Sequence, residues 1–145
     1  MLARAVRWGA TGVVLAAAAI QLVPYGRGHT NPPVLAEPAW DSPQTRMLAV
    51  RACFDWHSNE TVWPWYSNIA PLSWLVQRDV DEGRRRTNFS EWNRPRKNAR
   101  ESAETVQKGT MPPWYYPWAR LSPAERHELI QGLAVSVGDP QKAEE

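Results

Sequence analysis

Two side chains in the segment RACFDWHSNETVWPWYS, residues 51–67, have the chemistry to bind a metal or to attach a cofactor. Cys53 and His57 are four residues apart, so on a helix they lie on the same face, one turn from each other. These two ligands are two short of the four that zinc usually takes, and no other cluster in the sequence completes such a site. The pair alone is weak evidence, because any helix contains residues at this spacing.

The sequence CFDWH, residues 53–57, matches part of the Cys-x-x-Cys-His pattern that attaches haem in c-type cytochromes. It keeps the first cysteine and the histidine, but Trp56 stands where the second cysteine would be. Cys53 is the only cysteine in the chain, so it cannot form an internal disulfide. Its thiol is therefore either buried and unreactive or used in a bond to a cofactor or metal.

Met111 is the candidate for a second iron ligand, because a thioether sulfur is a soft donor and Met/His ligation holds haem at a raised potential. It follows Gly109 and precedes Pro112 and Pro113, which fix the backbone and exclude a helix. The competing interpretation is a methionine that fills a gap in the core. With His57 and Met111 both on iron, no coordination position is open, which favours an electron carrier over an enzyme. Weak peroxidase-like activity requires the distal ligand to dissociate.

The helix that positions the cysteine is predicted to begin after Ser42, which is a suitable N-cap, with Pro43 at the first helical position. Met47, Val50 and Phe54 fall on one stripe of this helix. The other ring nitrogen of the histidine should donate to a backbone carbonyl. We expect the loop 64–71 to supply that carbonyl.

Three further helices are predicted downstream. Residues 71–83 have apolar side chains at helical spacing and end at Gly83, and a polar helix ends at Gly109. Ser122 and Glu125 form a capping-box pattern at the start of the last helix, which presents Leu129, Ile130 and Leu133. No strand pattern or internal repeat appears, so we expect an all-α, cytochrome c-like single domain of short helices with long loops rich in proline and tryptophan, preceded by a hydrophobic helix.

The chain is predicted to comprise four parts: residues 1–24, an extended lead-in at 25–40, a haem-binding domain at 41–138 and a polar tail at 139–145. The first part has two arginines followed by fifteen uncharged residues, which is typical of an export signal or a short membrane anchor. We favour the anchor because the cleavage site is indistinct. The remainder is then periplasmic or otherwise extracytoplasmic, with the N-terminal segment at the inner membrane.

The charge of the exported part excludes nucleic acid as a partner. The chain has 17 basic and 15 acidic residues, and residues 1–24 hold two of the arginines and no acid, so the remainder is balanced. One basic cluster extends from Arg84 to Arg100. It is interpreted either as a solvated face or as a contact for an acidic redox partner or anionic headgroups.

Nine tryptophans are present, and few aliphatic residues are available to pack against them, so a large flat apolar ligand would supply a missing core. Aromatic rings in two segments are candidate walls for such a ligand, although each ring taken singly is more simply a core or loop anchor. An alternative function for these rings is sugar stacking in an exported carbohydrate or cell-wall binding module without haem. The candidates are Trp63, Trp65, Tyr66, Trp114, Tyr115, Tyr116 and Trp118.

The chain resembles the haem-binding domain family of bacterial exported proteins. The resemblance is carried by TNPPV (30–34), HSNETVWPWYSNIAP (57–71), NFSEW (88–92) and MPPWYYP (111–117), which together span almost all of the exported part. It implies a cytochrome c-like domain with one c-type haem per chain. In that scheme His57 is the proximal iron ligand, Cys53 the covalent attachment point and Met111 the distal ligand.

Trp56 departs from the family pattern, because one of two covalent bonds to the cofactor is lost. Three outcomes are open: haem held by a single thioether, which we favour, haem bound without a covalent bond, or no haem. We expect the Trp56 ring to cover a vinyl group of the porphyrin by apolar contact.

Overall fold

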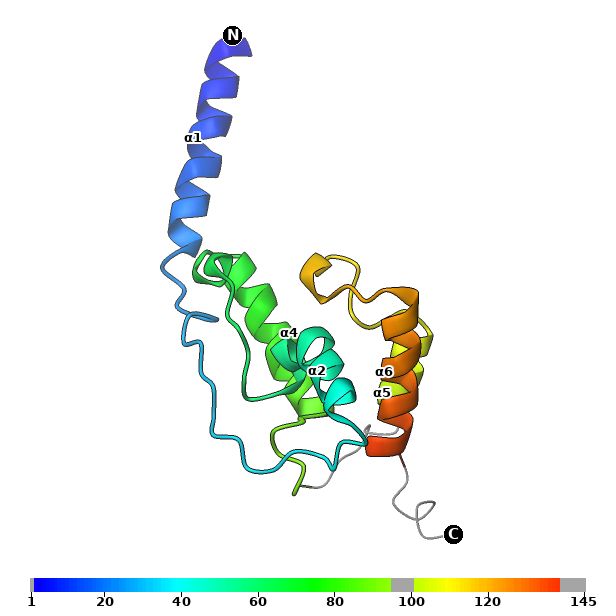
Figure 1. Cartoon of the computed structure of the whole chain (residues 1–145). Helices are drawn as coiled ribbons and strands as arrows, with labels where there is room; N and C mark the ends of the chain where they lie inside the picture. Colours follow the sequence, from blue (N-terminus) through cyan, green and yellow to red (C-terminus); the bar gives the residue numbers. More distant parts are fainter. Residues whose placement is uncertain (1, 95–100, 139–145) are drawn as a thin grey trace. The chain divides into compact units, whose positions relative to one another are not determined.

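The computed structural model describes residues 2–94 and 101–138, and within these residues it contains helices and no β-strand (Figure 1). The all-α prediction is confirmed. Ala36 and Glu91 form an isolated parallel bridge. The helices are α1 (Leu2–Ile20), α2 (Pro43–Ala52), α3 (Phe54–His57), α4 (Leu72–Arg86), α5 (Glu101–Gln107) and α6 (Pro123–Ser136), with 3₁₀ turns η1 (Trp65–Asn68) and η2 (Pro117–Ala119).

The helices belong to two compact units. The first unit comprises Met1–Thr30 and Trp63–Asp79, and the second comprises Asn31–Val62 and Val80–Glu145. Helix α4 contributes residues to both. The domain predicted at 41–138 therefore contains residues of both units.

The first unit is held together by side chains that bind backbone groups distant in sequence. The Gln21 amide donates to the Ala70 carbonyl at 2.9 Å, and its oxygen accepts from the Ala70 amide at 3.0 Å. The His29 ring stacks on Trp63 with centroids 4.8 Å apart, and its Nε2 lies 2.9 Å from the Ser67 hydroxyl. These contacts tie the segment after α1 to the loop that contains η1.

Helix α1 contains the apolar run of the N-terminal segment. Among residues 2–94 and 101–138, no helix combines the length and the apolar character needed to cross a bilayer. Export and anchoring remain predictions from the sequence.

The second unit is built on α2, α5 and α6. Ser42 caps α2 by accepting from the Thr45 amide at 3.1 Å, and Ser122 caps α6 through the predicted capping box. Helix α6 packs against α2 and α5. Gly132 permits the approach to α2, because a β-carbon there would meet the Thr45 hydroxyl at 2.0 Å.

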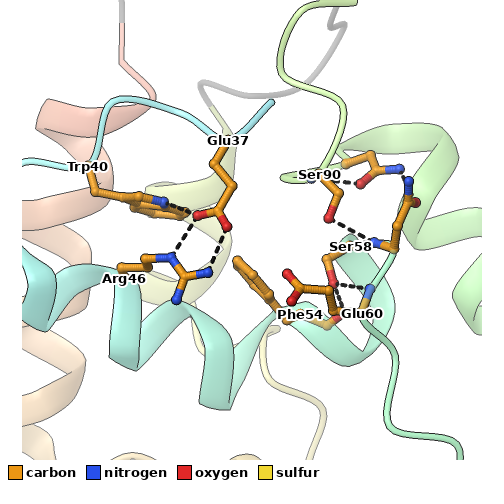
Figure 2. Close-up of polar contacts among 9 residues, drawn as sticks. Glu37, Trp40, Arg46, Phe54, Ser58, Glu60 and Ser90 are labelled. Carbon is orange, nitrogen blue, oxygen red and sulfur yellow. Dashed lines mark hydrogen bonds and ion pairs between the residues drawn. The ribbon is translucent and has the colours of Figure 1, made fainter. Parts of the chain in front are cut away.

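The core of this unit combines aliphatic residues of three helices with a stack of aromatic rings. Phe89 lies between Phe54 and Trp92, with both centroid distances at 5.8 Å and the rings nearly parallel. Trp40 packs on the same ring, and Figure 2 shows its indole N–H donating to Glu37, which also binds Arg46. The buried aliphatic residues include Leu48, Ala49, Ala52, Val106, Leu129, Leu133 and Val137.

The apolar stripe predicted for α2 is wrong in two of its three members. Met47 and Val50 are exposed, whereas Leu48, Ala49 and Ala52 are buried. The buried face is the one that meets α6, and small residues there let the two helices approach. Phe54 is buried as predicted, but it belongs to α3.

The predicted end of α4 at Gly83 is also wrong, since the helix continues to Arg86. Gly83 lies inside α4 at the point where this helix passes close to the backbone of Trp56. The glycine is required by packing and not by helix termination. Gly109, in contrast, follows α5 with a φ of 71° and ends it as predicted.

Candidate cofactor-binding site

Cys53, His57 and Met111 line one cavity of about 90 Å³ in the second unit. The sequence predicted these three residues as cofactor contacts from their chemistry, and folding brings them together although Met111 lies far along the chain. The apolar part of the wall includes Ala52, Phe89, Val106 and Leu133, and the polar part includes Arg86, Thr87, Glu101, Ser102 and Thr105.

Cys53 and His57 reach the cavity because the chain turns helically between them. Cys53 is the residue between α2 and α3. Its φ of −127° is not helical, so the two helices are separate elements. Its carbonyl oxygen accepts from the His57 amide at 2.9 Å, so the pair keeps helical spacing across the break. The Cys53 side chain is buried, and burial raises the pKa of its thiol to about 12, so the thiol is protonated at neutral pH.

The His57 ring is held by a backbone carbonyl, as predicted, but the carbonyl belongs to Thr87 and not to the loop 64–71. His57 Nδ1 donates to the Thr87 oxygen at 3.0 Å. A carbonyl only accepts, so Nδ1 carries the hydrogen and, in the neutral ring, Nε2 carries the lone pair. Burial lowers the pKa of the His57 ring. This decrease is larger than the increase caused by hydrogen bonds to the Thr87 and Gly83 carbonyls, so the neutral ring is favoured.

A hydrogen-bonded layer supports the backbone on either side of His57. The His57 carbonyl accepts from the Phe89 amide at 2.7 Å, and the Ser90 hydroxyl accepts from the Asn59 amide at 2.9 Å. The Ser58 hydroxyl donates to the Phe54 carbonyl and accepts from the Glu60 amide (Figure 2). The segments 57–60 and 87–90 are thereby joined by backbone and side-chain contacts.

Met111 enters the cavity from a turn that follows α5. The Thr105 carbonyl accepts from the Thr110 amide at 3.1 Å and from the Met111 amide at 3.3 Å, which folds the chain back after Gly109. The Met111 side chain is half-buried and packs against the core. Its competing interpretation as a gap-filling core residue is consistent with this packing, and iron ligation remains a prediction.

The aromatic candidates do not gather at this cavity. The Trp56 ring packs against Tyr116 at a centroid distance of 4.3 Å and is not among the residues that line the cavity wall. Trp114 is 85% exposed, and Tyr115 is 54% exposed. Trp118 is exposed, and Trp63, Trp65 and Tyr66 belong to the first unit.

The described arginines of the basic cluster contact groups within the chain. Arg84 Nε donates to the Ser58 carbonyl at 2.7 Å, Arg86 pairs with Glu82 at 2.7 Å, and Arg94 pairs with Glu91. Arg96, Lys97 and Arg100 lie outside the described residues.

The sequence did not single out Thr87 or Thr105, because their backbone carbonyls, which any residue carries, are the groups that act.

Beside the Glu101 carboxylate, the cavity wall has one thiol, one imidazole and one thioether, and these softer groups suit an iron centre such as haem. In the part of the chain that the structure describes, no group of three or more His, Cys, Asp or Glu residues could hold a metal ion.

The cavity is smaller than the roughly 300–1,000 Å³ typical of small-molecule sites, so a porphyrin requires its walls to move apart.

Comparison with known proteins identifies one family. The sequence model described as "Haem-binding domain" matches residues 15–134. That range contains every described residue of the cavity wall. No curated protein and no solved structure matches the chain.

Proposed function

The chain belongs to the haem-binding domain family, and from that premise we propose that its haem binds in the cavity formed by Cys53, His57 and Met111. The observation that carries the proposal is the convergence of a thiol, an imidazole and a thioether on one cavity. The family binds haem, so the alternative of a carbohydrate-binding module without haem is set aside. The proposal assigns one haem to each chain.

His57 is the proposed proximal ligand. The Thr87 carbonyl fixes the hydrogen on Nδ1, and burial keeps the ring neutral, so Nε2 presents its lone pair to a metal without a proton to displace. The carbonyl also restrains the rotation of the ring. Met111 is the proposed distal ligand, supplied by the turn after α5.

Cys53 is the proposed attachment point for a single thioether. Addition of its S–H bond across one vinyl group would form a C–S bond and leave the thiol hydrogen on the neighbouring carbon, so no oxidant or reductant would be consumed. The second vinyl group has no cysteine to react with, because Trp56 occupies that position of the motif.

A porphyrin needs more room than the cavity of about 90 Å³ offers. The wall combines α2, α3, the segment 86–89 and α6 with α5 and the Met111 turn. Helix α5 packs on α6, but it has only seven residues, of which Val106 is the one buried side chain. We propose that α5 and the turn move outward as haem enters. Arg86 and Ser102, on the polar part of the wall, are then suited to bind the haem carboxylates.

We propose one-electron transfer outside the cytoplasm as the biological role. Bound haem would supply an iron centre that changes by one electron, and His57 and Met111 would occupy the positions that a substrate would need. The arginine-led N-terminal segment supports export. The redox partner is proposed to contact the basic cluster from Arg84 to Arg100, and rising salt should then slow electron exchange.

The test is production of the full chain in an export-competent host with ample haem. Haem that stays attached after denaturation, with a pyridine haemochrome band for one reacted vinyl, supports the single thioether, and Cys53→Ala should release it. Met111→Ala should convert a low-spin spectrum to one with an open or water-bound position. Met47→Ala is the matched control, because Met47 is exposed on α2. A colourless folded chain would contradict the proposal, and an unchanged Met111→Ala spectrum would remove that ligand.

A further inference from the structure

Asp55, which lies between the attachment cysteine and the proximal histidine, is bonded to the segment that carries the distal methionine. Its carboxylate accepts from the Val62 amide at 2.9 Å and from the Tyr116 hydroxyl. Its own carbonyl accepts from the Thr61 hydroxyl at 2.9 Å. Asp55 is therefore fixed by its own loop and extends a contact to Tyr116.

Tyr116 is also enclosed by rings. It is buried, its ring centroid lies 4.3 Å from that of Trp56, and Trp118 packs edge-on at 4.6 Å. Trp56 thus adds an aromatic contact beside the hydrogen bond that the Tyr116 hydroxyl donates to Asp55. Both contacts join α3 to the loop 110–118.

Met111 lies between two attachments of this loop. On one side, the Thr110 and Met111 amides donate to the Thr105 carbonyl and bind the loop to α5. On the other side, Tyr116 binds it to α3. If α5 moves outward to admit haem, the hydrogen bond at Tyr116 and the packing of η2 on α2 still tie the loop that carries Met111 to the helices bearing Cys53 and His57.

We propose that Asp55 and Tyr116, supported by Trp56, form a positioning latch that keeps the Met111 sulfur at the cavity and so keeps the sixth iron position closed. This inference rests on the proposed function, because it requires Met111 to be the distal ligand. It assigns Trp56 a role that differs from the one expected of it. The ring that replaces the second cysteine packs on the latch instead of lining the cavity.

The latch is tested in the haem-loaded full chain with imidazole as an external ligand for the ferric iron. Tyr116→Phe deletes the hydrogen bond that the hydroxyl donates to the carboxylate, and Asp55→Asn leaves at most a weaker, neutral hydrogen bond in its place. Imidazole affinity should therefore rise by about tenfold or more. Tyr115→Phe is the same change one residue earlier; it keeps the ring that contacts Trp56 and leaves the bond between Tyr116 and Asp55 intact, so the affinity should stay near that of the wild type.

A double-mutant comparison separates positioning from general loosening. In a Met111→Ala background the sixth position is already open, so adding Tyr116→Phe should leave imidazole affinity unchanged. Equal gains in both backgrounds, or no gain from Tyr116→Phe alone, would overturn the latch. Failure of the proposed function has a different signature, which is a Met111→Ala spectrum identical to that of the wild type.

Hydrogen exchange on the haem-free chain provides a readout independent of the iron. Tyr116→Phe should accelerate exchange of the backbone amides in 110–118 relative to Tyr115→Phe, while the amides of α6 stay protected. Unchanged exchange in that loop contradicts the latch whatever the iron ligand is.

Discussion

A β-carbon at Gly83 would come within 2.2 Å of the Trp56 carbonyl oxygen, so the two backbones are in direct contact. This contact brings the last turns of α4 against α3. The chain leaves α4 at Thr87, whose carbonyl then meets His57. The absence of a side chain at Gly83 thus determines where the candidate iron ligand is held.

Gly83→Ala should destabilise the second unit, although alanine is favoured over glycine in a helix by about 1 kcal/mol. The added methyl group meets backbone, which cannot rotate away, and forced repacking of this kind costs about 1–3 kcal/mol. Moving α4 away from Trp56 should also weaken the hydrogen bond between the His57 ring and the Thr87 carbonyl. Urea denaturation of the haem-free chain measures the first effect, and haem affinity measures the second.

Gly12→Ala is the control for this substitution. Gly12 also lies within a helix, and a β-carbon there has nothing within 4 Å. It should be neutral or slightly stabilising. Equal effects of the two changes would show that the approach of α4 to Trp56 is not a constraint.

The stability of the haem-free chain should fall as the pH falls below about 6.5, the pKa of an unfolded histidine. Burial lowers the pKa of His57, so between its folded pKa and 6.5 the unfolded chain binds more protons than the folded chain. The free energy of unfolding therefore decreases with falling pH in that window. Carboxylates with lowered pKa values, such as Glu37, act only at lower pH.

His57→Gln should flatten this pH dependence, because glutamine does not titrate and its amide can still donate to the Thr87 carbonyl. His127→Gln, at an exposed position of α6, is the matched control and should retain the slope. Denaturant unfolding at several pH values between 5 and 7 measures both. If the free energy of unfolding of His57→Gln still decreases with falling pH in this window, the pH dependence belongs to another titrating group.

The helix starts and stops were predictable where the signal is local. Ser42 and Ser122 cap helices through bonds to amides three residues ahead, and Gly109 ends a helix through its own positive φ. Each of these depends on a few consecutive residues, which is the range over which a sequence pattern is informative.

Tertiary packing explains the errors. Glycine is the residue type expected at the end of a helix, but Gly83 is required because α4 packs closely against the backbone of Trp56, a residue distant in sequence. Met47 and Val50 are apolar, yet α6 meets the opposite face of α2. Cys53, His57 and Met111 could be selected from the sequence because a thiol, an imidazole and a thioether are chemically distinctive, and the structure places them on one cavity. A backbone carbonyl such as that of Thr87 has no such signal.

Trp56→Ala should destabilise the haem-free chain by about 3–5 kcal/mol, the usual cost of truncating a buried tryptophan. Trp56 is only 7% exposed, and its removal leaves a void beside Tyr116 and α4. Trp114→Ala removes the same atoms from a ring that is 85% exposed and should change stability by less than about 0.5 kcal/mol. Chemical denaturation of both variants tests this, and a mild effect at Trp56 would contradict its structural role.

Cys53 should react slowly with iodoacetamide in the folded haem-free chain. Burial raises the pKa of its thiol to about 12, so the thiolate fraction at pH 8 is far below that of an exposed cysteine, whose pKa is about 8.5. Alkylation, followed by intact mass, should be at least about a hundredfold slower than in urea. The haem-loaded chain should resist alkylation even in urea, because a thioether has no thiol to react. Rapid labelling of the folded haem-free chain would contradict the buried thiol, and labelling of the unfolded haem-loaded chain would contradict the covalent bond.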